Sequence, residues 1–109
     1  MNKDVKTMLK IYKTKNIDWL GYEVCSNCKL TRHHIFKKVY GGVSDISNYA
    51  LLIEKSHEYL HLLEQKDHRA FIELSNLFRE LNDSLAPPTE EYYEKVSKIL
   101  KRTRVKPKP

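Results

Sequence analysis

The sequence predicts a small α+β domain that is mostly helical: a ββα unit, made of a hairpin and a helix, with one helix before it and two after it. Three observations predict this class. Apolar residues recur at helical spacing near both ends of the chain, two short β-prone stretches flank a Gly-Gly loop, and Pro87-Pro88 separates the last two helical stretches. For 109 residues we expect a single domain over residues 1–103, with the ββα core at residues 22–66.

Composition and charge restrict the class of protein. The chain has 20 Lys plus Arg against 14 Asp plus Glu, and its net charge of +6 favours a polyanionic partner. A basic protein without such a partner is the alternative that charge alone leaves open. No apolar run approaches the roughly 20 residues of a membrane span, and no apolar signal segment follows the N-terminus. We therefore expect a cytoplasmic protein with reduced cysteines and no membrane partner.

The first helix is expected at residues 3–15. Its apolar face has the spacing i, i+3, i+4 and i+7, at Val5, Met8, Leu9 and Tyr12. Asn2 or Asp4 can cap this helix. The pattern then breaks, and we expect Trp19 and Leu20 to dock the connection onto the core. Residues 22–24 follow as a candidate short strand.

Cys25 and Cys28 form a CxxC pair, which is half of a tetrahedral zinc site. The sequence has no other cysteine, so a four-cysteine site cannot be built within it. One interpretation is a structural zinc completed by two histidines. The other, which we favour, is a pair of reduced thiols in a tight turn.

The ββα unit itself begins near residue 30. Residues 30–36 and 49–53 predict two strands, and the loop between them holds Gly41-Gly42 and several Ser, Asp and Asn residues. Glycine permits positive φ, and the polar side chains bond back to the loop backbone. Residues 54–66 predict a helix about 20 Å long.

Two further helices complete the chain. Residues 68–85 carry an apolar stripe at Phe71, Leu74, Leu77, Phe78, Leu81 and Leu85. Pro87-Pro88 ends this helix, and Thr89 can cap the next one, which has two glutamates in its first turn. Residues 104–109 are basic and contain two prolines, so we expect a disordered tail there.

Four of the five histidines lie between residues 33 and 61, as two pairs. His57 and His61 are four apart, so they share one face of the predicted helix. Neutral imidazole is a common metal ligand. The hairpin can bring His33 or His34 towards that face, although adjacent strand residues point to opposite sides. We expect His57 and His61, together with one histidine of the hairpin, to hold one divalent metal ion, Mg²⁺, Mn²⁺, Ni²⁺ or Zn²⁺.

This order of residues resembles the HNH endonuclease family, the ββα-metal nucleases, over residues 22–65. The matching residues are His33-His34-Ile35, Gly41-Gly42, Asp45, Asn48, Leu51-Leu52, His57 and His61. The resemblance implies that His33 and His57 are metal ligands and that His61 binds the metal or the phosphate. It also implies that His34 is the general base and that Asn48 braces the loop around it.

The same resemblance implies hydrolysis of double-stranded DNA to 5′-phosphate and 3′-hydroxyl ends, in a protein of a kind found in phages and mobile elements. Lys29, Arg32, Lys37 and Lys38 flank the first histidine pair and are expected to bind the DNA backbone. The last two helices are expected to cover the ββα unit, or to form a homodimer that cuts both strands.

Two other functions stay open at this point. One is a binding module that keeps the nuclease scaffold without turnover and retains DNA or a protein partner. The other is a structural zinc protein on Cys25, Cys28 and two histidines. The chain lacks the second CxxC that many small HNH proteins carry before the last histidine, and Ile53 and Ser56 occupy that region.

Overall fold

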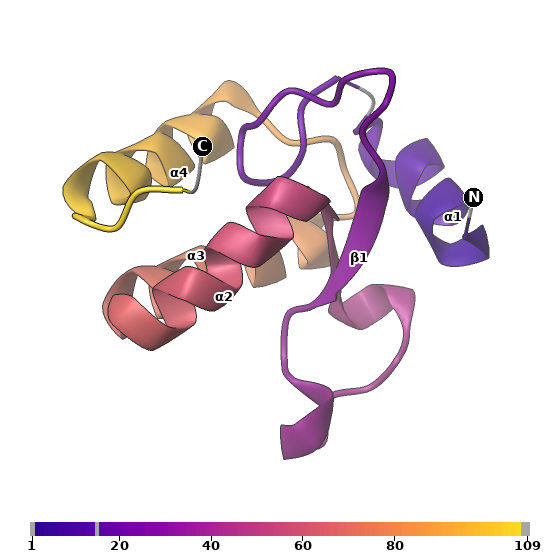
Figure 1. The fold of residues 1–109 in the computed structure, drawn as a ribbon. Helices are drawn as coiled ribbons and strands as arrows, with labels where there is room; N and C mark the ends of the chain where they lie inside the picture. The colour runs from indigo at the N-terminus through magenta and orange to yellow at the C-terminus, as the bar shows by residue number, and fades with distance from the viewer. Residues whose placement is uncertain (1, 15, 108–109) are drawn as a thin grey trace.

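The structure is a computed structural model that describes residues 2–14 and 16–107. Within these residues, four α-helices accompany one two-stranded antiparallel sheet (Figure 1). The elements are α1 (Lys3–Tyr12), β1 (Leu30–His34), η1 (Lys38–Tyr40), η2 (Ile46–Asn48), β2 (Tyr49–Ile53), α2 (Glu54–Lys66), α3 (His68–Ser84) and α4 (Glu90–Arg102). The predicted class, a mostly helical α+β domain, is confirmed.

The predicted bounds hold for β2 and α2 and differ elsewhere for local reasons. Helix α1 ends at Tyr12 because Lys13 adopts a left-handed φ of 52° and donates its N–H to the Leu9 carbonyl; residue 15, predicted to be helical, lies outside the described residues. Leu85 also has a φ of 52°, which takes it out of α3 and leaves it exposed, so its place on the apolar stripe was wrong. An isolated bridge between Ile17 and Glu23 stands where a short strand was expected.

The hairpin sets the direction of the first histidine pair. Strand β1 pairs with β2 so that His33 lies opposite Ala50 and His34 opposite Tyr49. Successive strand residues point to opposite faces, and cross-strand partners share a face. His33 therefore faces α2, while His34 lies on the other face, beside the ring of Tyr49.

The segment between α1 and β1 docks on the core as predicted. Trp19 and Leu20 are fully buried, and the indole N–H of Trp19 donates to the hydroxyl of Thr14. The hydroxyl of Tyr92 on α4 donates to the carbonyl of Trp19. This segment thus connects the N-terminal part of the chain to the last helix.

The carboxylate of Asp18 links the same segment to the ββα unit. One of its oxygens accepts the backbone N–H groups of Leu20 and Tyr22, each at 3.0 Å. The other accepts the N–H of Ile53 at 3.0 Å and the hydroxyl of Ser56 at 2.6 Å. Ile53 is the N-cap of α2 and makes no side-chain capping bond. Asp18 therefore supplies from a distance the negative charge that a helix N-terminus favours.

The C-terminal segment is more ordered than predicted. The hydroxyl of Tyr59 donates to the carbonyl of Val105 at 2.6 Å, and the N–H of Val105 donates to Thr103. Val105 also packs against the core, so the prediction of a disordered tail is wrong at this residue. Residues 108–109 of the predicted tail lie outside the described residues.

Replacing Asp18 tests the distant cap. Asp18→Ala is expected to lower the free energy of unfolding by about 3 kcal/mol or more, because it leaves several buried donors without an acceptor. Urea unfolding at pH 7 measures this change. The control Asp83→Ala removes an exposed carboxylate near the end of α3 and should change stability by less than about 0.5 kcal/mol. If both variants lost the same small amount of unfolding free energy, Asp18 would not be the group that caps α2.

Candidate functional site

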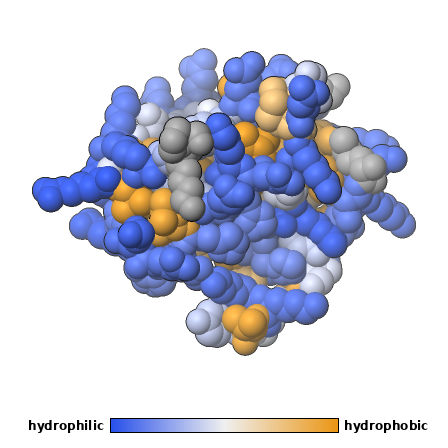
Figure 2. Space-filling model, viewed as in Figure 1, coloured by the Kyte–Doolittle hydropathy of each residue, from blue (hydrophilic) through white to orange (hydrophobic). Residues whose placement is uncertain are grey.

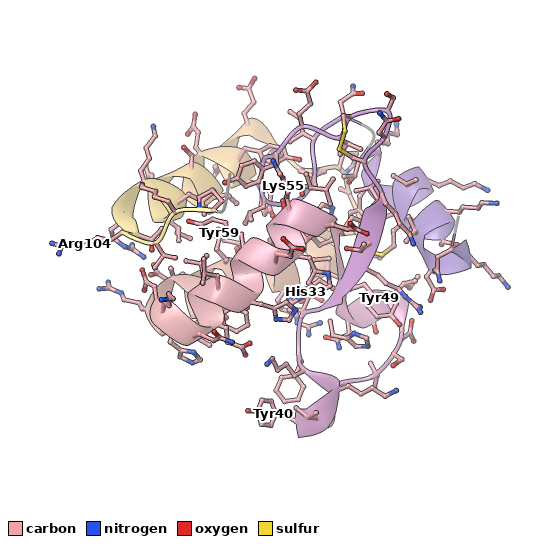
Figure 3. All side chains as sticks on the ribbon, in the orientation of Figure 1. His33, Tyr40, Tyr49, Lys55, Tyr59 and Arg104 are labelled. Carbon is pink, nitrogen blue, oxygen red and sulfur yellow. A yellow bond between two sulfur atoms is a disulfide. The ribbon has the colours of Figure 1, made fainter. Side chains whose placement is uncertain are left out.

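Four histidines border one pocket where β1 ends against α2. The pocket has a volume of about 240 Å³. Its lining residues are His33, His34, Lys37, Lys38, Val39, His57 and His61. Figure 3 places His33 in the space between α2 and the lower end of β1. The structure therefore brings together both predicted histidine pairs, and the roles of the four residues stay predictions.

Two of these imidazoles point their nitrogens at one another. His33 is 4% exposed, and its Nδ1 lies 3.4 Å from Nε2 of His57. Two nitrogens bound tetrahedrally to one zinc ion, at about 2.0–2.1 Å, are also about 3.3–3.4 Å apart. The ring of His61 stacks on that of His57 with centroids 5.0 Å apart. The separation of the first pair therefore fits either a hydrogen bond between the two rings or a shared cation.

Thr31 fixes which nitrogen of His57 carries the proton. The Thr31 hydroxyl donates to the carbonyl of Leu52 at 2.8 Å. Its oxygen lies 3.2 Å from His57 Nδ1 and therefore accepts a hydrogen bond from it. In neutral His57 the lone pair is consequently on Nε2, which faces His33. A hydrogen bond of this kind also orients a metal-binding histidine.

The donor set matches a metal ion only in part. Nε2 of His33 is buried without a hydrogen-bond partner in the described part of the chain. Across residues 2–14 and 16–107, no group of three His, Cys, Asp or Glu side chains is arranged to hold a metal ion. The residues fit a cation that takes two ligands from His33 and His57, with the remaining positions left to water or phosphate.

Burial keeps these ligands neutral. It lowers the pKa of His33 from its ordinary value of 6.5 to about 3, with smaller contributions from the nearby His57 and His61. Burial also lowers the pKa of His57, and His61 adds to this shift. A metal ion binds a nitrogen that carries no proton, so neutral His33 can bind a cation through Nδ1 when its single ring proton is on Nε2.

His34 leaves the strand on the opposite face from His33, yet it borders the same pocket because β1 ends there. Its Nε2 lies 3.3 Å from the hydroxyl of Ser44. Its ring contacts that of Tyr49 edge to face, with centroids 5.1 Å apart. The side chain is partly exposed, so solvent can reach it.

Asn48 holds the loop that follows His34. Its Oδ1 accepts the N–H of Phe36 at 2.9 Å, and its Nδ2 donates to the carbonyls of Phe36 and Val43. The guanidinium of Arg79 on α3 donates to the same Oδ1 at 2.9 Å and to the carbonyl of Ser47. The Asn48 contacts replace strand pairing beyond His34, which explains why β1 stops before the predicted residue 36.

The predicted basic residues do not all reach the pocket. Lys37 and Lys38 line it, and the ammonium of Lys37 also lies 2.7 Å from a carboxylate oxygen of Glu64. Arg32 bonds Asp4 and the hydroxyl of Tyr49, so it belongs to the opposite face. Lys29 is exposed before β1 begins.

Three residues near the site were not predicted from the sequence. Thr31 lies two positions before His33 and so shares its strand face, which is a signal that alternation could have supplied. Glu64 lies one helical turn after His61, with its carboxylate 4.0 Å from His61 Nδ1. Arg79 reaches Asn48 from a helix 31 positions away, and no local pattern marks it.

The cysteine prediction is wrong in this structure, since a disulfide joins Cys25 and Cys28. In the turn between them, the N–H of Cys28 donates to the carbonyl of Cys25 at 3.0 Å. The Cα atoms are therefore 5.0 Å apart, within the range of disulfides. Two bonded sulfurs are not the thiolates that zinc requires, so a structural zinc on this pair does not fit.

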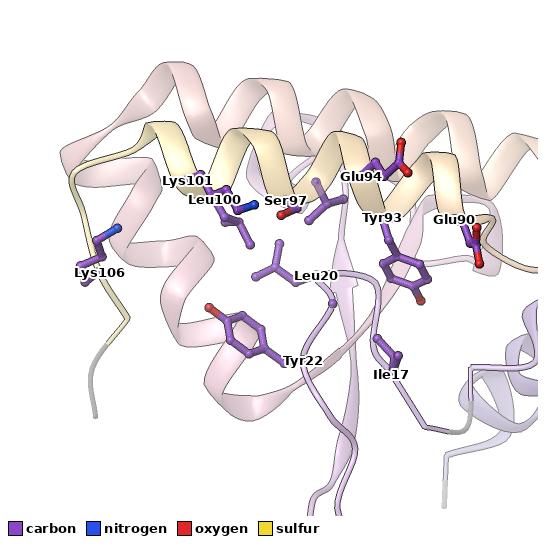
Figure 4. Close-up of a pocket in the computed structure, with 12 residues that line it drawn as sticks. Ile17, Leu20, Tyr22, Glu90, Tyr93, Glu94, Ser97, Leu100, Lys101 and Lys106 are labelled. Carbon is purple, nitrogen blue, oxygen red and sulfur yellow. The ribbon is translucent and has the colours of Figure 1, made fainter.

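Another, larger pocket lies between the segment after α1 and helix α4 (Figure 4). Its volume is about 650 Å³, and apolar and tyrosine side chains dominate its wall, together with Glu90, Glu94, Lys101 and Lys106. Its lining includes no histidine or cysteine. The imidazoles that can bind a metal are thus found at the smaller pocket.

No family model, curated protein or solved structure with which the chain was compared matches it. The resemblance to HNH endonucleases therefore rests on the residues of this chain. None of the helices in the described ranges is long and apolar enough to cross a membrane.

The low pKa of His33 predicts a pH dependence of stability. Because the folded chain holds His33 neutral down to pH 3 and the unfolded chain protonates near 6.5, stability decreases as the pH falls through this window. The slope is about 1.4 kcal/mol per pH unit for one proton. Urea unfolding between pH 6 and 4 should show a shallower slope for His33→Gln than for the wild type.

The matched control for that experiment is His68→Gln. His68 is exposed on the first turn of α3, and this variant should keep the wild-type slope. If His33→Gln and the wild type lost stability equally with falling pH, the buried neutral state of His33 would be refuted.

Proposed function

We propose that this protein is a metal-dependent endonuclease that hydrolyses phosphodiester bonds of DNA, with an HNH-type site. The observation that carries the proposal is the convergence of His33 Nδ1 and His57 Nε2, 3.4 Å apart, from two different elements. The basic side chains of Lys37 and Lys38 line the same pocket. Paired neutral nitrogens beside lysine side chains favour a cation and a phosphate together.

The two imidazoles hold the cation in this proposal. A divalent ion bound there would supply Lewis-acid stabilisation of the phosphate and the leaving 3′ oxygen. Thr31 keeps the lone pair of His57 on the correct nitrogen. Imidazole ligands suit Zn²⁺ and Ni²⁺ better than Mg²⁺, which prefers oxygen. His61, stacked on His57 and more exposed, is proposed to contact the phosphate or to complete the metal shell.

His34 is proposed as the general base. Its ring is reachable from solvent, and the contact of its Nε2 with Ser44 is long at 3.3 Å, so a water can compete for this nitrogen. A positioned base of this kind contributes about 10²–10⁴-fold to a rate. Asn48 supports the role indirectly, because it fixes the backbone that follows His34.

The proposed partner is double-stranded DNA. Lys37 and Lys38 would bind the phosphates that flank the reacting one, in a salt-sensitive and largely sequence-independent way. The proposed products are 5′-phosphate and 3′-hydroxyl ends, as the family resemblance implies. A homodimer would present two sites to the two strands, and sedimentation with and without DNA measures whether it forms.

A binding module without turnover is the second candidate. It is favoured by the finding that no three ligand side chains in the described residues form a metal-binding group. Such a module would retain DNA in a salt-dependent manner, or a protein partner, under every metal condition. It would have no use for the partly exposed imidazole of His34, so substitution of that residue would leave its binding unchanged.

Plasmid cleavage separates the two candidates. We expect the wild type to nick or cut supercoiled DNA with at least one of Mg²⁺, Mn²⁺, Ni²⁺ and Zn²⁺. His34→Ala should reduce the rate about 10²–10⁴-fold, and His68→Ala, an exposed histidine outside the pocket, should not. Equal rates for wild type and His34→Ala would remove the base assignment. Retention of DNA without cutting under all four metals would favour the binding module.

Thr31 gives a separate test that does not depend on cleavage. Thr31→Val keeps the shape of the side chain but removes the acceptor for His57 Nδ1, so the affinity for Zn²⁺ or Ni²⁺ should fall about 10–100-fold. Isothermal titration of the metal measures this change. Thr7→Val, on the exposed face of α1, is the control and should bind like the wild type. Unchanged affinity in Thr31→Val would contradict the role of Thr31 in orienting His57.

A further inference from the structure

The loop between the strands exposes an unusual amount of apolar surface. Seven large hydrophobic side chains are exposed in the described residues. Four of them lie in this loop, within the eight consecutive residues 36–43. They are Phe36 (51% exposed), Val39 (82%), Tyr40 (71%) and Val43 (58%), which we call the apolar tip. Single exposed hydrophobic residues are ordinary, whereas a cluster marks an interaction surface.

The apolar tip stands away from the rest of the domain. Figure 1 shows the loop with η1 projecting beyond the helices, and Figure 2 shows hydrophobic atoms on the same projection. Figure 3 places Tyr40 at its far end. The side chains of Phe36 and Tyr40 lie next to each other, with ring centroids 6.5 Å apart. A projecting pair of rings can reach into a partner.

The tip is also held in one conformation. Asn48 bonds the backbone at both of its ends, through Phe36 and Val43. Inside it, the N–H groups of Tyr40 and Gly42 both donate to the carbonyl of Lys37 at 3.0 Å. A Cβ on Gly42 would lie 1.9 Å from the Phe36 carbonyl oxygen, so only glycine allows this closure. A preorganised tip loses little conformational entropy when it binds.

The tip and the histidine pocket form one continuous surface. Val39 lines the pocket, together with Lys37 and Lys38. Lys37 and Lys38 are the basic residues of this surface, Lys37 also pairs with Glu64, and residues 36–44 contain no Asp or Glu. A surface that combines basic and aromatic side chains suits nucleic acid, whose backbone is anionic and whose bases have flat apolar faces. An uncharged apolar protein partner would have no use for the lysines.

We propose that the apolar tip is a wedge that inserts between bases next to the phosphate bound at the histidine pocket. Val39 and Tyr40 would separate one base step, and the ring of Tyr40 or Phe36 would stack on the exposed base. Apolar wedges of this kind unstack DNA in architectural proteins. Unstacking is easiest where the bases are already unpaired, so the proposal implies preferential binding to DNA with a local mismatch or bubble. It rests on the proposed nuclease function for its placement beside the phosphate.

The test measures binding to two DNA duplexes in EDTA, where no cleavage takes place. One duplex is fully paired and the other has a central two-nucleotide bubble with 2-aminopurine beside it. The variant Val39→Ser/Tyr40→Ser removes the tip, and Ile72→Ser/Leu85→Ser removes two exposed hydrophobic residues elsewhere. Circular dichroism and thermal melting check that both fold. Fluorescence anisotropy gives the affinities, and 2-aminopurine fluorescence reports unstacking.

We expect the wild type and the control to bind the bubble about tenfold more tightly than the paired duplex, the size of one lost base–aromatic stack. The tip variant should lose this preference and the fluorescence change. Equal preference in the tip variant, or no DNA binding by the wild type, would overturn the proposal. Sedimentation and co-pelleting with phosphatidylserine vesicles test two other uses of the tip. A tip variant that binds DNA normally but loses self-association or vesicle binding would also overturn the proposal.

These results are independent of cleavage. A wild type that shows the bubble preference and never cuts DNA would support the wedge and refute the nuclease. A wild type that cuts DNA without preferring the bubble would support the nuclease and refute the wedge.

Discussion

The site depends on how helix α2 is seated against strand β1, and the buried carboxylate of Asp18 fixes that seating. His57 is the residue after Ser56, whose hydroxyl donates to Asp18 at 2.6 Å. The same carboxylate accepts the N–H of Ile53, at the junction of β2 and α2.

Helix α2 has 13 residues and an isoleucine as its N-cap, so no side chain of its own defines where it begins. The anchor therefore also sets the depth at which the His57 ring meets that of His33. Burial raises the pKa of Asp18 while its hydrogen bonds oppose the shift, so the anchor combines a desolvation cost with several strong contacts.

The histidine pocket shows a related balance between burial and charge. Placing His33 inside the domain disfavours its protonated form, and the neighbouring imidazoles of His57 and His61 act in the same direction. A buried histidine is usually satisfied by two hydrogen bonds, whereas here Nε2 has none in the described structure and Nδ1 has only the long one with His57 Nε2, at 3.4 Å. Such an arrangement is poor for stability alone, and local rules tend to be broken at functional sites. The buried Nε2 of His33 therefore costs stability without a visible structural benefit, which is the physical reason to look for a function at this pocket.

The sequence predicted the local features of the fold and missed the contacts that join distant segments. The bounds of β2 and α2 follow from β-prone residues ahead of a helical pattern, and Asn2 and Thr89 cap their helices as expected. Convergence of His33 and His57 could be foreseen because a hairpin followed at once by a helix leaves few alternatives. The roles of Asp18 and Arg79 could not, since their partners lie 35 and 31 positions away. The order at Val105 likewise depends on Tyr59, 46 positions earlier. The disulfide was missed because the expected compartment, rather than the turn geometry, decided the cysteine prediction.

Asn48 joins the two parts of the surface that the proposals treat separately. Its side chain bonds the backbone just after His34 and also closes both ends of the apolar tip. Arg79 holds Asn48 in turn from α3, the helix that packs on α2. Strand β1 itself holds both His33 and His34, through their pairing with Ala50 and Tyr49, and Asn48 fixes the backbone immediately after them. The apolar tip and the histidine pocket therefore share one support, because the side chain that closes the loop also determines where the strand ends.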